Sequence, residues 1–178
     1  TRLEPMYLAN VLLFITDVEI VSAFPFFSRT CQEAMLTLKV NPPVFKSPDK
    51  ILRFFPNINT MAIGDLLCLY KTNTLPDTVT ALVVRCLNFF DLHEPHFRFA
   101  DRVVEIRGCV SDKQRPADFS LFPRLERVDL TCISNSTPDR VILPKHTLKS
   151  VKVFWQRDSP TPLTLFPPHC AEQITVIY

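Results

Sequence analysis

A strand-like pattern, apolar-x-x-apolar-x-apolar, recurs at a nearly constant interval from residue 58 to the C-terminus of this 178-residue chain. A period of this length is typical of a solenoid, in which each unit has one short strand and buries its apolar side only by stacking on its neighbours. We therefore expect six short parallel strands in one continuous sheet, in chain order, with their central residues buried in one column. Those residues are Met61, Leu82, Val104, Val128, Val151 and Ile174, at steps of 21, 22, 24, 23 and 23 residues.

A proline stands shortly before most of these strand patterns. Proline has no backbone N–H and biases the residue before it toward extended geometry, so it marks the return loop ahead of a strand. In the third copy the segment 96–99, His-Phe-Arg-Phe, takes its place. The recurring pairs are Phe55-Pro56, Leu75-Pro76, Phe122-Pro123, Leu143-Pro144 and Phe166-Pro167.

Spacing and period together resemble the leucine-rich repeat, whose units are about 20 to 29 residues long. The resemblance covers roughly residues 50–178. It implies a leucine-rich-repeat solenoid with irregular connections, whose concave face receives a partner. The repeats are irregular because the family's usual Asn, three residues after the second strand Leu, is replaced. That position holds Leu66, Leu87, Cys109, Ile133 and Gln156.

The first 45 residues show helical spacing and no repeat. Apolar residues at positions 8, 11, 12 and 15 share one helical face, Asp17 can cap a second short helix, and Ser28 can cap a third. Residues 41–50 form the expected linker, and the segment from residue 49 to 55 has helical spacing again. The chain is therefore expected to be α+β, with a three-helix segment at residues 1–45 and repeats at residues 46–178.

The helical segment resembles an F-box, which opens with Leu-Pro and continues as L-x-x-I-L-x-x-L. The opening here is Leu-Glu-Pro at residues 3–5, with the proline one place late, and Cys31 stands at the family's Trp position. F-box-like helices followed by repeats are similar to F-box/leucine-rich-repeat proteins. The resemblance implies an adaptor that binds a Skp1-type protein of a ubiquitin ligase. Its partner-facing and helix-packing positions are Leu3, Pro5, Leu8 and Ile15.

The concave face predicted for the repeats is charged in its middle. Side chains alternate across a strand, and parallel strands about 4.8 Å apart bring neighbouring outward side chains within reach of one another. Two interpretations stay open, namely mutual salt bridges on a solvated face or a docking surface for a protein partner. Phe154, or Trp155 beside it, either anchors that partner or packs at the strand end. The residues concerned are Arg85, Glu105, Arg107, Arg127, Asp129, Lys152 and Phe154.

Composition excludes several classes of function. The chain has only two glycines, too few for the Gly-rich loops that bind phosphates or dinucleotides, and it lacks the common hydrolase motifs. We therefore expect no enzyme activity and no cofactor. A net charge of +2 is too weak to indicate nucleic-acid or membrane-surface binding, and no apolar stretch reaches the roughly 18 residues that span a bilayer.

Three of the six cysteines, Cys86, Cys109 and Cys132, follow the repeat period. Small buried residues at equivalent positions explain this spacing more simply than a disulfide framework does. We expect six free thiols in a reducing compartment, the cytoplasm or nucleus. Cys86, His93, His96 and Cys109 are the one metal-like set, but two core thiols and two loop imidazoles are the preferred interpretation, so no metal is expected.

The sequence thus favours a non-enzymatic protein–protein adaptor, with substrate recognition in a Skp1-containing ubiquitin ligase as the role that the resemblance implies. Two alternatives stay open. The helices could only cap the end of a scaffold solenoid, or the repeats could regulate a larger protein. Exposed apolar side chains on the helices separate adaptor from cap, because a cap would turn them all into the repeats.

Overall fold

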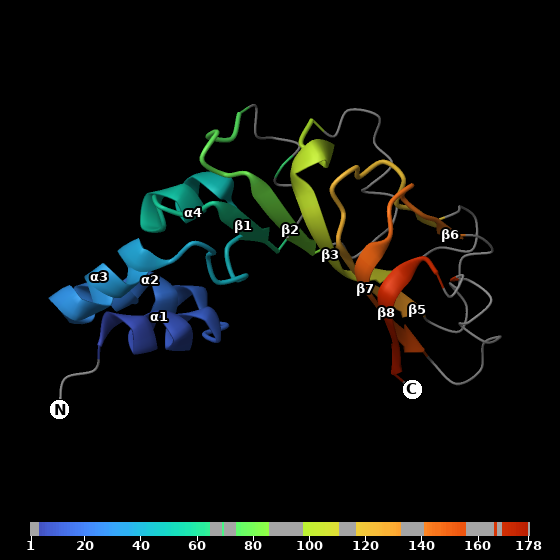
Figure 1. The fold of residues 1–178 in the computed structure, drawn as a ribbon. Helices are drawn as coiled ribbons and strands as arrows, with labels where there is room; N and C mark the ends of the chain where they lie inside the picture. The colour runs from blue at the N-terminus through green and yellow to red at the C-terminus, as the bar shows by residue number, and fades with distance from the viewer. Residues whose placement is uncertain are drawn as a thin grey trace. The chain divides into compact units, whose positions relative to one another are not determined.

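The computed structural model describes residues 4–64, 69, 74–85, 98–110, 117–132, 141–155, 166 and 169–177. Figure 1 shows helices first and strands after them. The chain divides into two compact units, Thr1–Leu82 and Val83–Tyr178. The helices are α1 (Pro5–Leu13), α2 (Val18–Phe27), α3 (Arg29–Thr37), α4 (Pro48–Phe54) and the short 3-10 helix η2 (Ala100–Arg102). The strands are β1 (Thr60–Ile63), β2 (Ala81–Arg85), β3 (Val103–Val110), β4 (Ala117–Asp118), β5 (Arg127–Cys132), β6 (Val141–Ile142), β7 (Leu148–Trp155) and β8 (Ala171–Ile177).

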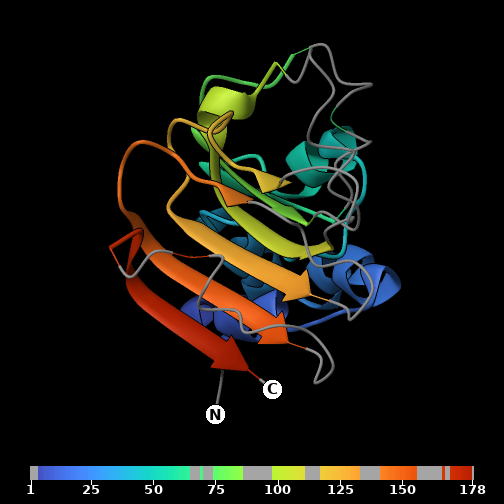
Figure 2. The same ribbon diagram turned by 90° about the vertical axis from the view of Figure 1, so that its right-hand side faces the viewer.

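Six of the strands form one all-parallel sheet in the order β1-β2-β3-β5-β7-β8, and β4 pairs with β6 separately. In Figure 2 the arrows of β5, β7 and β8 point the same way. The prediction of six parallel strands in chain order is confirmed. Parallel neighbours need a crossover between them rather than a two-residue hairpin, which agrees with steps of more than 20 residues.

Backbone hydrogen bonds repeat with the sequence period. The N–H of Glu126 donates to the carbonyl of Val104, and the N–H of Lys149 donates to the carbonyl of Glu126. A tight turn ahead of the strand also recurs, with a carbonyl accepting from the N–H three residues on. Its four copies are Phe55 to Ile58, Pro76 to Val79, Phe99 to Arg102 and Phe122 to Leu125.

The residue before the recurring proline packs in the core. Phe55, Phe122 and Phe166 are at most 2% exposed, and Leu75 is also buried, whereas Leu143 is half-buried. A ring of this size filling the space behind the strand contributes on the order of 2 kcal/mol through removal of apolar surface from water. The Phe-Pro pair is therefore both a turn signal and a core position.

The central residues of the first five strand patterns are buried, as predicted: Met61, Leu82, Val104, Val128 and Val151. Ile174 is only half-buried, so the prediction that all six are buried is wrong for the last pattern. The reason is that β8 is the terminal strand in the sheet order, so the side chains of only one neighbouring strand in this sheet flank it.

Strand β3 is paired two residues away from the alignment expected from the sequence. Ile106 rather than Val104 lies beside Val128, and Glu105 lies beside Arg127. A shift of two keeps every side chain on its predicted face, because side chains alternate with a period of two. The register then changes between Ile106 and Cys109, where Gly108 has a φ of 63°. That left-handed conformation favours glycine and is typical of a β-bulge.

Alternation along the strands predicts an outward position for three apolar residues, Ala62, Val83 and Val103, but all three are buried. Strands β1 and β2 are consequently covered on both faces, as parallel strands commonly are. The charged outward face begins only at Arg85, which is exposed at the end of β2.

The free edge of β1 is covered by residues 39–45. The carbonyl of Lys39 accepts from the N–H groups of Asn59 and Thr60. The amide of Asn41, 1% exposed, accepts from Ala62 N–H at 2.9 Å and donates to the Ala62 carbonyl at 2.7 Å. A side chain thus takes the place of a neighbouring strand at an edge that would otherwise offer unpaired backbone groups. Part of the segment predicted as a linker is therefore bound to the sheet.

Helix α3 packs against both α1 and α2. The predicted N-caps are confirmed, since Asp17 accepts from the N–H groups of Glu19 and Ile20, and Ser28 accepts from Cys31 N–H. Pro25 lies inside α2 rather than at its end. The buried residues of the three helices include Leu12, Val21, Phe24, Cys31, Ala34 and Met35.

Within the described ranges, none of the helices has both the length and the apolar content to cross a bilayer. Cys31 and Cys170 are free thiols in that part of the chain. Cys68 and Cys86 lie outside it, so the expectation of six free thiols stays a prediction. His93 and His96 lie outside it too, so the expectation of no bound metal also stays a prediction, as does the boundary at residue 45.

Replacing Asn41 by alanine should lower the free energy of unfolding by about 2–4 kcal/mol. The change removes three buried hydrogen bonds, one to the Pro42 carbonyl and two to Ala62, and leaves the N–H and carbonyl of Ala62 unsatisfied. Urea unfolding followed by circular dichroism measures this loss. Asn57→Ala is the matched control, since exposed Asn57 donates one bond to the Leu36 carbonyl and should cost less than about 1 kcal/mol. Equal losses for the two variants would contradict the edge-covering role.

Candidate protein-interaction surfaces

The outward face of the second unit, defined as the face that carries Arg127, Lys152 and Phe154, is built from three rows of registered side chains. Because the strands are parallel and in register, each row crosses the sheet nearly at right angles to the strands. The first row is Glu105, Arg127, Ser150 and Gln173, the second is Asp129, Lys152 and Thr175, and the third is Thr131, Phe154 and Ile177.

Glu105 is the centre of an ion-pair network on this face. Arg107 donates from Nε to Glu105 Oε1, and Arg127 donates from Nε to Oε2 at 2.9 Å. Arg127 also reaches Glu126 at 3.3 Å, which in turn pairs with Lys149 at 2.9 Å. The Glu105 side chain is 10% exposed, against 50% for Arg107 and 42% for Arg127. Mutual salt bridging, one of the two interpretations of this face, is thus present around Glu105.

The pKa values of the two carboxyls on this face shift in opposite directions. Burial raises the pKa of Glu105, but the hydrogen bonds from Arg107 and Arg127 outweigh it and hold this pKa below its ordinary value. Burial also raises the pKa of Asp129, and the attraction of Lys152 only partly offsets it. Glu105 is therefore a firmly ionised anchor for its two arginines.

The remaining predicted residues of the outward face are less constrained. Arg85 forms no ion pair with any described residue, and its Nε lies 4.0 Å from the point where a Cβ on Gly108 would stand. Lys152 lies opposite Asp129 across β5 and β7. Phe154 is 39% exposed beside Ile177, which is 41% exposed, so the end of the face carries an apolar patch.

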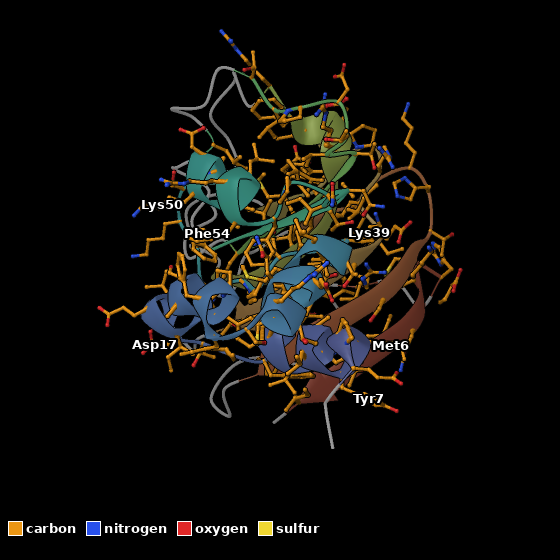
Figure 3. All side chains as sticks on the ribbon, turned by 90° about the vertical axis from the view of Figure 1, so that its left-hand side faces the viewer. Met6, Tyr7, Asp17, Lys39, Lys50 and Phe54 are labelled. Atoms are coloured by element: carbon orange, nitrogen blue, oxygen red, sulfur yellow. The ribbon has the colours of Figure 1, made fainter. Side chains whose placement is uncertain are left out.

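The first unit offers a second surface, on its helices. Of the twelve exposed large apolar side chains in the described ranges, nine lie between Met6 and Leu36. Tyr7 and Val11 on α1, and Phe14 at its C-cap, recur at the spacing of one helical face and are 56%, 56% and 84% exposed. Figure 3 shows Met6 and Tyr7 on α1, apart from Lys50 and Phe54 on α4. The others are Val18, Ile20, Phe26, Phe27 and Leu36.

The positions that the F-box resemblance assigned lie beside this apolar surface. Pro5, Leu8 and Ile15 are half-buried, and Leu3 lies outside the described residues. Val11 had been expected on the same helical face as Leu12, but Leu12 is fully buried and Val11 is exposed. Sequence analysis missed Tyr7 and Phe14, although the 7-11-14 spacing was a signal that could have found them.

A hollow of about 350 Å³ lies among α2, α3 and α4. Its walls are mostly apolar, with the guanidinium of Arg53 as the one cationic group among the residues that line it. The lining residues are Pro25, Phe26, Gln32, Met35, Leu36, Arg53, Phe54 and Pro56. The hollow thus adjoins the exposed Phe26 and Leu36 and extends the apolar character of the helical surface.

Comparison of the chain with models of protein families, with curated proteins and with solved structures found no match. The two surfaces are therefore interpreted from their own residues.

Glu105→Gln should lower the free energy of unfolding by about 1–2 kcal/mol at neutral pH, because the amide keeps the shape but loses the charge that holds two half-exposed arginines. The folded-state pKa of Glu105 lies below its ordinary value of 4.5. Its contribution is therefore complete above pH 4.5 and is lost as the pH falls through the folded-state pKa. The difference between wild type and variant should shrink accordingly.

Urea unfolding at a series of pH values measures this difference. Glu33→Gln is the control, because Glu33 forms an exposed pair with Arg29 at 3.0 Å and should contribute at most a few tenths of a kcal/mol. A Glu105 difference that grows toward acid pH would contradict the assignment of an ionised anchor.

Proposed function

We propose that this chain is a protein–protein interaction adaptor built as an irregular leucine-rich-repeat solenoid with an F-box-like helical segment. The recurrence of the same turn ahead of four of the strands, and of interstrand hydrogen bonds at steps of about one sequence period, supports the solenoid. The adaptor has two surfaces for partners, the helical surface of the first unit and the outward face of the second. The proposal assigns no catalytic role to any residue.

The observation that carries this function is the concentration of exposed large apolar side chains on α1, α2 and α3. Monomeric proteins rarely leave such side chains exposed together unless a partner covers them. The stripe of Tyr7, Val11 and Phe14 has the spacing with which a helix presents anchors to a groove. A protein partner bound over this stripe would remove the apolar surface from water.

The F-box resemblance indicates the class of that partner, a Skp1-type protein. Pro5, Leu8 and Ile15 occupy the assigned positions and stay partly accessible, so they can extend the contact made by the exposed stripe. In this role the chain is the substrate-recognition subunit of a Skp1-containing ubiquitin ligase, and the outward face of the sheet receives the substrate.

A cap is the alternative role of the helices. The main task of a cap is to cover the unpaired edge of the first strand. Residues 39–45 already perform that task at β1, through Lys39 and Asn41. A capping role therefore leaves the exposure of Tyr7, Val11 and Phe14 without a purpose, whereas an adaptor requires it.

The double substitution Val11→Glu with Phe14→Glu should weaken binding of a purified Skp1-type protein at least about tenfold, because it places two charges in a desolvated contact. Thermal stability should change little, since both side chains are exposed in the free chain. Isothermal titration calorimetry measures the first effect and a melting curve the second.

Lys50→Glu is the matched control, because it changes the net charge by the same amount at an exposed position on α4 and should bind as wild type does. Leu12→Ala checks the interior of the helical segment and should cost about 2–5 kcal/mol of unfolding free energy. Unfolding of the double variant, or a wild-type chain that binds no Skp1-type protein, would decide for the cap.

A further inference from the structure

We infer that the outward face of β3, β5 and β7 binds an acidic segment of a protein partner in extended conformation. A pair of Asp or Glu carboxylates would lie on the arginine cluster, defined as Arg85, Arg107 and Arg127. A large apolar side chain further along the same segment would lie on Phe154. This inference names the substrate class for the sheet face of the adaptor, so it rests on the proposed function.

The geometry of Glu105 orients the arginine cluster without saturating it. Arg107 and Arg127 each use Nε to bind one oxygen of the same buried carboxylate. A guanidinium has five N–H donors, and among the described residues Arg107 uses only this one. Its terminal amino groups are therefore held in place by Glu105 and still able to donate to a ligand carboxylate.

The charges of the face do not cancel at the cluster. The cluster has three guanidiniums and one carboxylate, Glu105, which bonds Arg107 and Arg127 but not Arg85, so two positive charges are in excess. Beside the cluster, Glu126 bonds both Lys149 and Arg127, and Asp129 lies opposite Lys152. These two carboxylates and two lysines add no net charge. Because the anchor carboxylate is buried and the arginines are half-exposed or exposed, the excess charge faces solvent.

Gly108 leaves space beside the cluster. A Cβ at this position would meet only Arg85 Nε, at 4.0 Å, among the atoms of described residues outside its chain neighbours. The bulge at Gly108 therefore puts a backbone segment without a side chain next to Arg85 and Arg107. Among the described residues, a carboxylate that approaches both guanidiniums there would displace no other side chain.

The apolar patch at the end of the face indicates a peptide rather than a nucleic acid. Phe154 and Ile177 stand in the third row, and Arg127 stands in the first. Arg127 lies beside Ser150 of the neighbouring strand β7, and Phe154 is four residues further along β7. The two positions are therefore roughly 14 Å apart. An extended chain covers that distance in about four residues. The expected ligand therefore has its acidic pair and its apolar side chain about four residues apart.

Fluorescence anisotropy with the intact chain and a set of labelled peptides tests this inference. Each peptide carries a Glu-Glu pair and a Phe, at separations from one to eight residues in a Ser/Thr background, and each has a Gln-Gln counterpart. The Glu-Glu peptides should bind at least about tenfold more tightly than their counterparts, best at a separation of three to five residues. Added salt should weaken this binding, because part of the charge is solvent-exposed.

Two substitutions should each weaken binding of the best peptide at least about fivefold, namely Arg85→Ala and Phe154→Ala. Neither should disturb folding, because Arg85 has no ion pair within the described ranges and Phe154 is exposed. Arg98→Ala is the matched control, since it removes an exposed arginine of the same unit that lies outside the strands of the face, and it should leave binding unchanged.

Equal binding of Glu-Glu and Gln-Gln peptides, or equal effects of Arg85→Ala and Arg98→Ala, would overturn the inference. So would inorganic phosphate or a single-stranded oligonucleotide that competes more strongly than the best peptide, because the face would then be a phosphate site. The assay contains no Skp1-type protein, and the Val11→Glu, Phe14→Glu variant should bind the peptides normally. Failure of peptide binding and failure of the helical contact are thus measured separately.

Discussion

Each strand of the sheet is held by backbone hydrogen bonds to residues about one repeat earlier. The rest of the structure depends on these bonds between neighbouring repeats. Two successive bonds of this ladder run from the N–H of Lys149 to the carbonyl of Glu126, and from the N–H of Glu126 to the carbonyl of Val104. No repeat can pair all of its own backbone N–H and carbonyl groups, so the first and last strands of the sheet each have an edge without a neighbouring strand. At the first strand Asn41 supplies side-chain amide groups in place of a strand. At the last strand the consequence is visible in Ile174, which is only half-buried.

The same ladder brings charges together that are far apart in the sequence. Glu105 and Arg127 are neighbours because β3 and β5 pair in parallel with that register. A buried carboxylate between two arginines is costly to desolvate, and the two hydrogen bonds it accepts compensate for that cost. The arrangement fixes the direction of the guanidiniums, while the terminal amino groups of Arg107 bond no described residue. A structural salt bridge and a recognition surface are therefore compatible here.

The helical surface follows from a different constraint. Short helices are stable only when they pack against other elements, and α3 packs against both α1 and α2. Leu12, Val21 and Met35 fill the resulting core. The helices carry more apolar residues than this core can accept, and the surplus is the stripe of Tyr7, Val11 and Phe14. A binding function explains these exposed apolar side chains, whereas a purely structural role does not.

The six parallel strands of the main sheet and their order could be predicted from the sequence, because equal units of 21 to 24 residues stack side by side and have room for a crossover between successive strands. The sequence also determined the helix starts at Asp17 and Ser28, since a capping side chain acts on its own next turn. It placed Arg127, Asp129, Lys152 and Phe154 on one face, because alternation along a strand is local.

The pairing of β3 could not be predicted from the sequence, because a shift of two residues preserves the alternation of side chains and leaves the apolar pattern unchanged. Only the tertiary structure decided that Ala62 and Val83 are covered, since an apolar residue on an outward position is compatible with either exposure or burial. Helical periodicity could not tell which apolar face of α1 meets α3, so Val11 was assigned to the wrong side. Asn41 was missed for a related reason. Its partner, the Ala62 peptide, is 21 residues away and becomes a neighbour only when the chain folds.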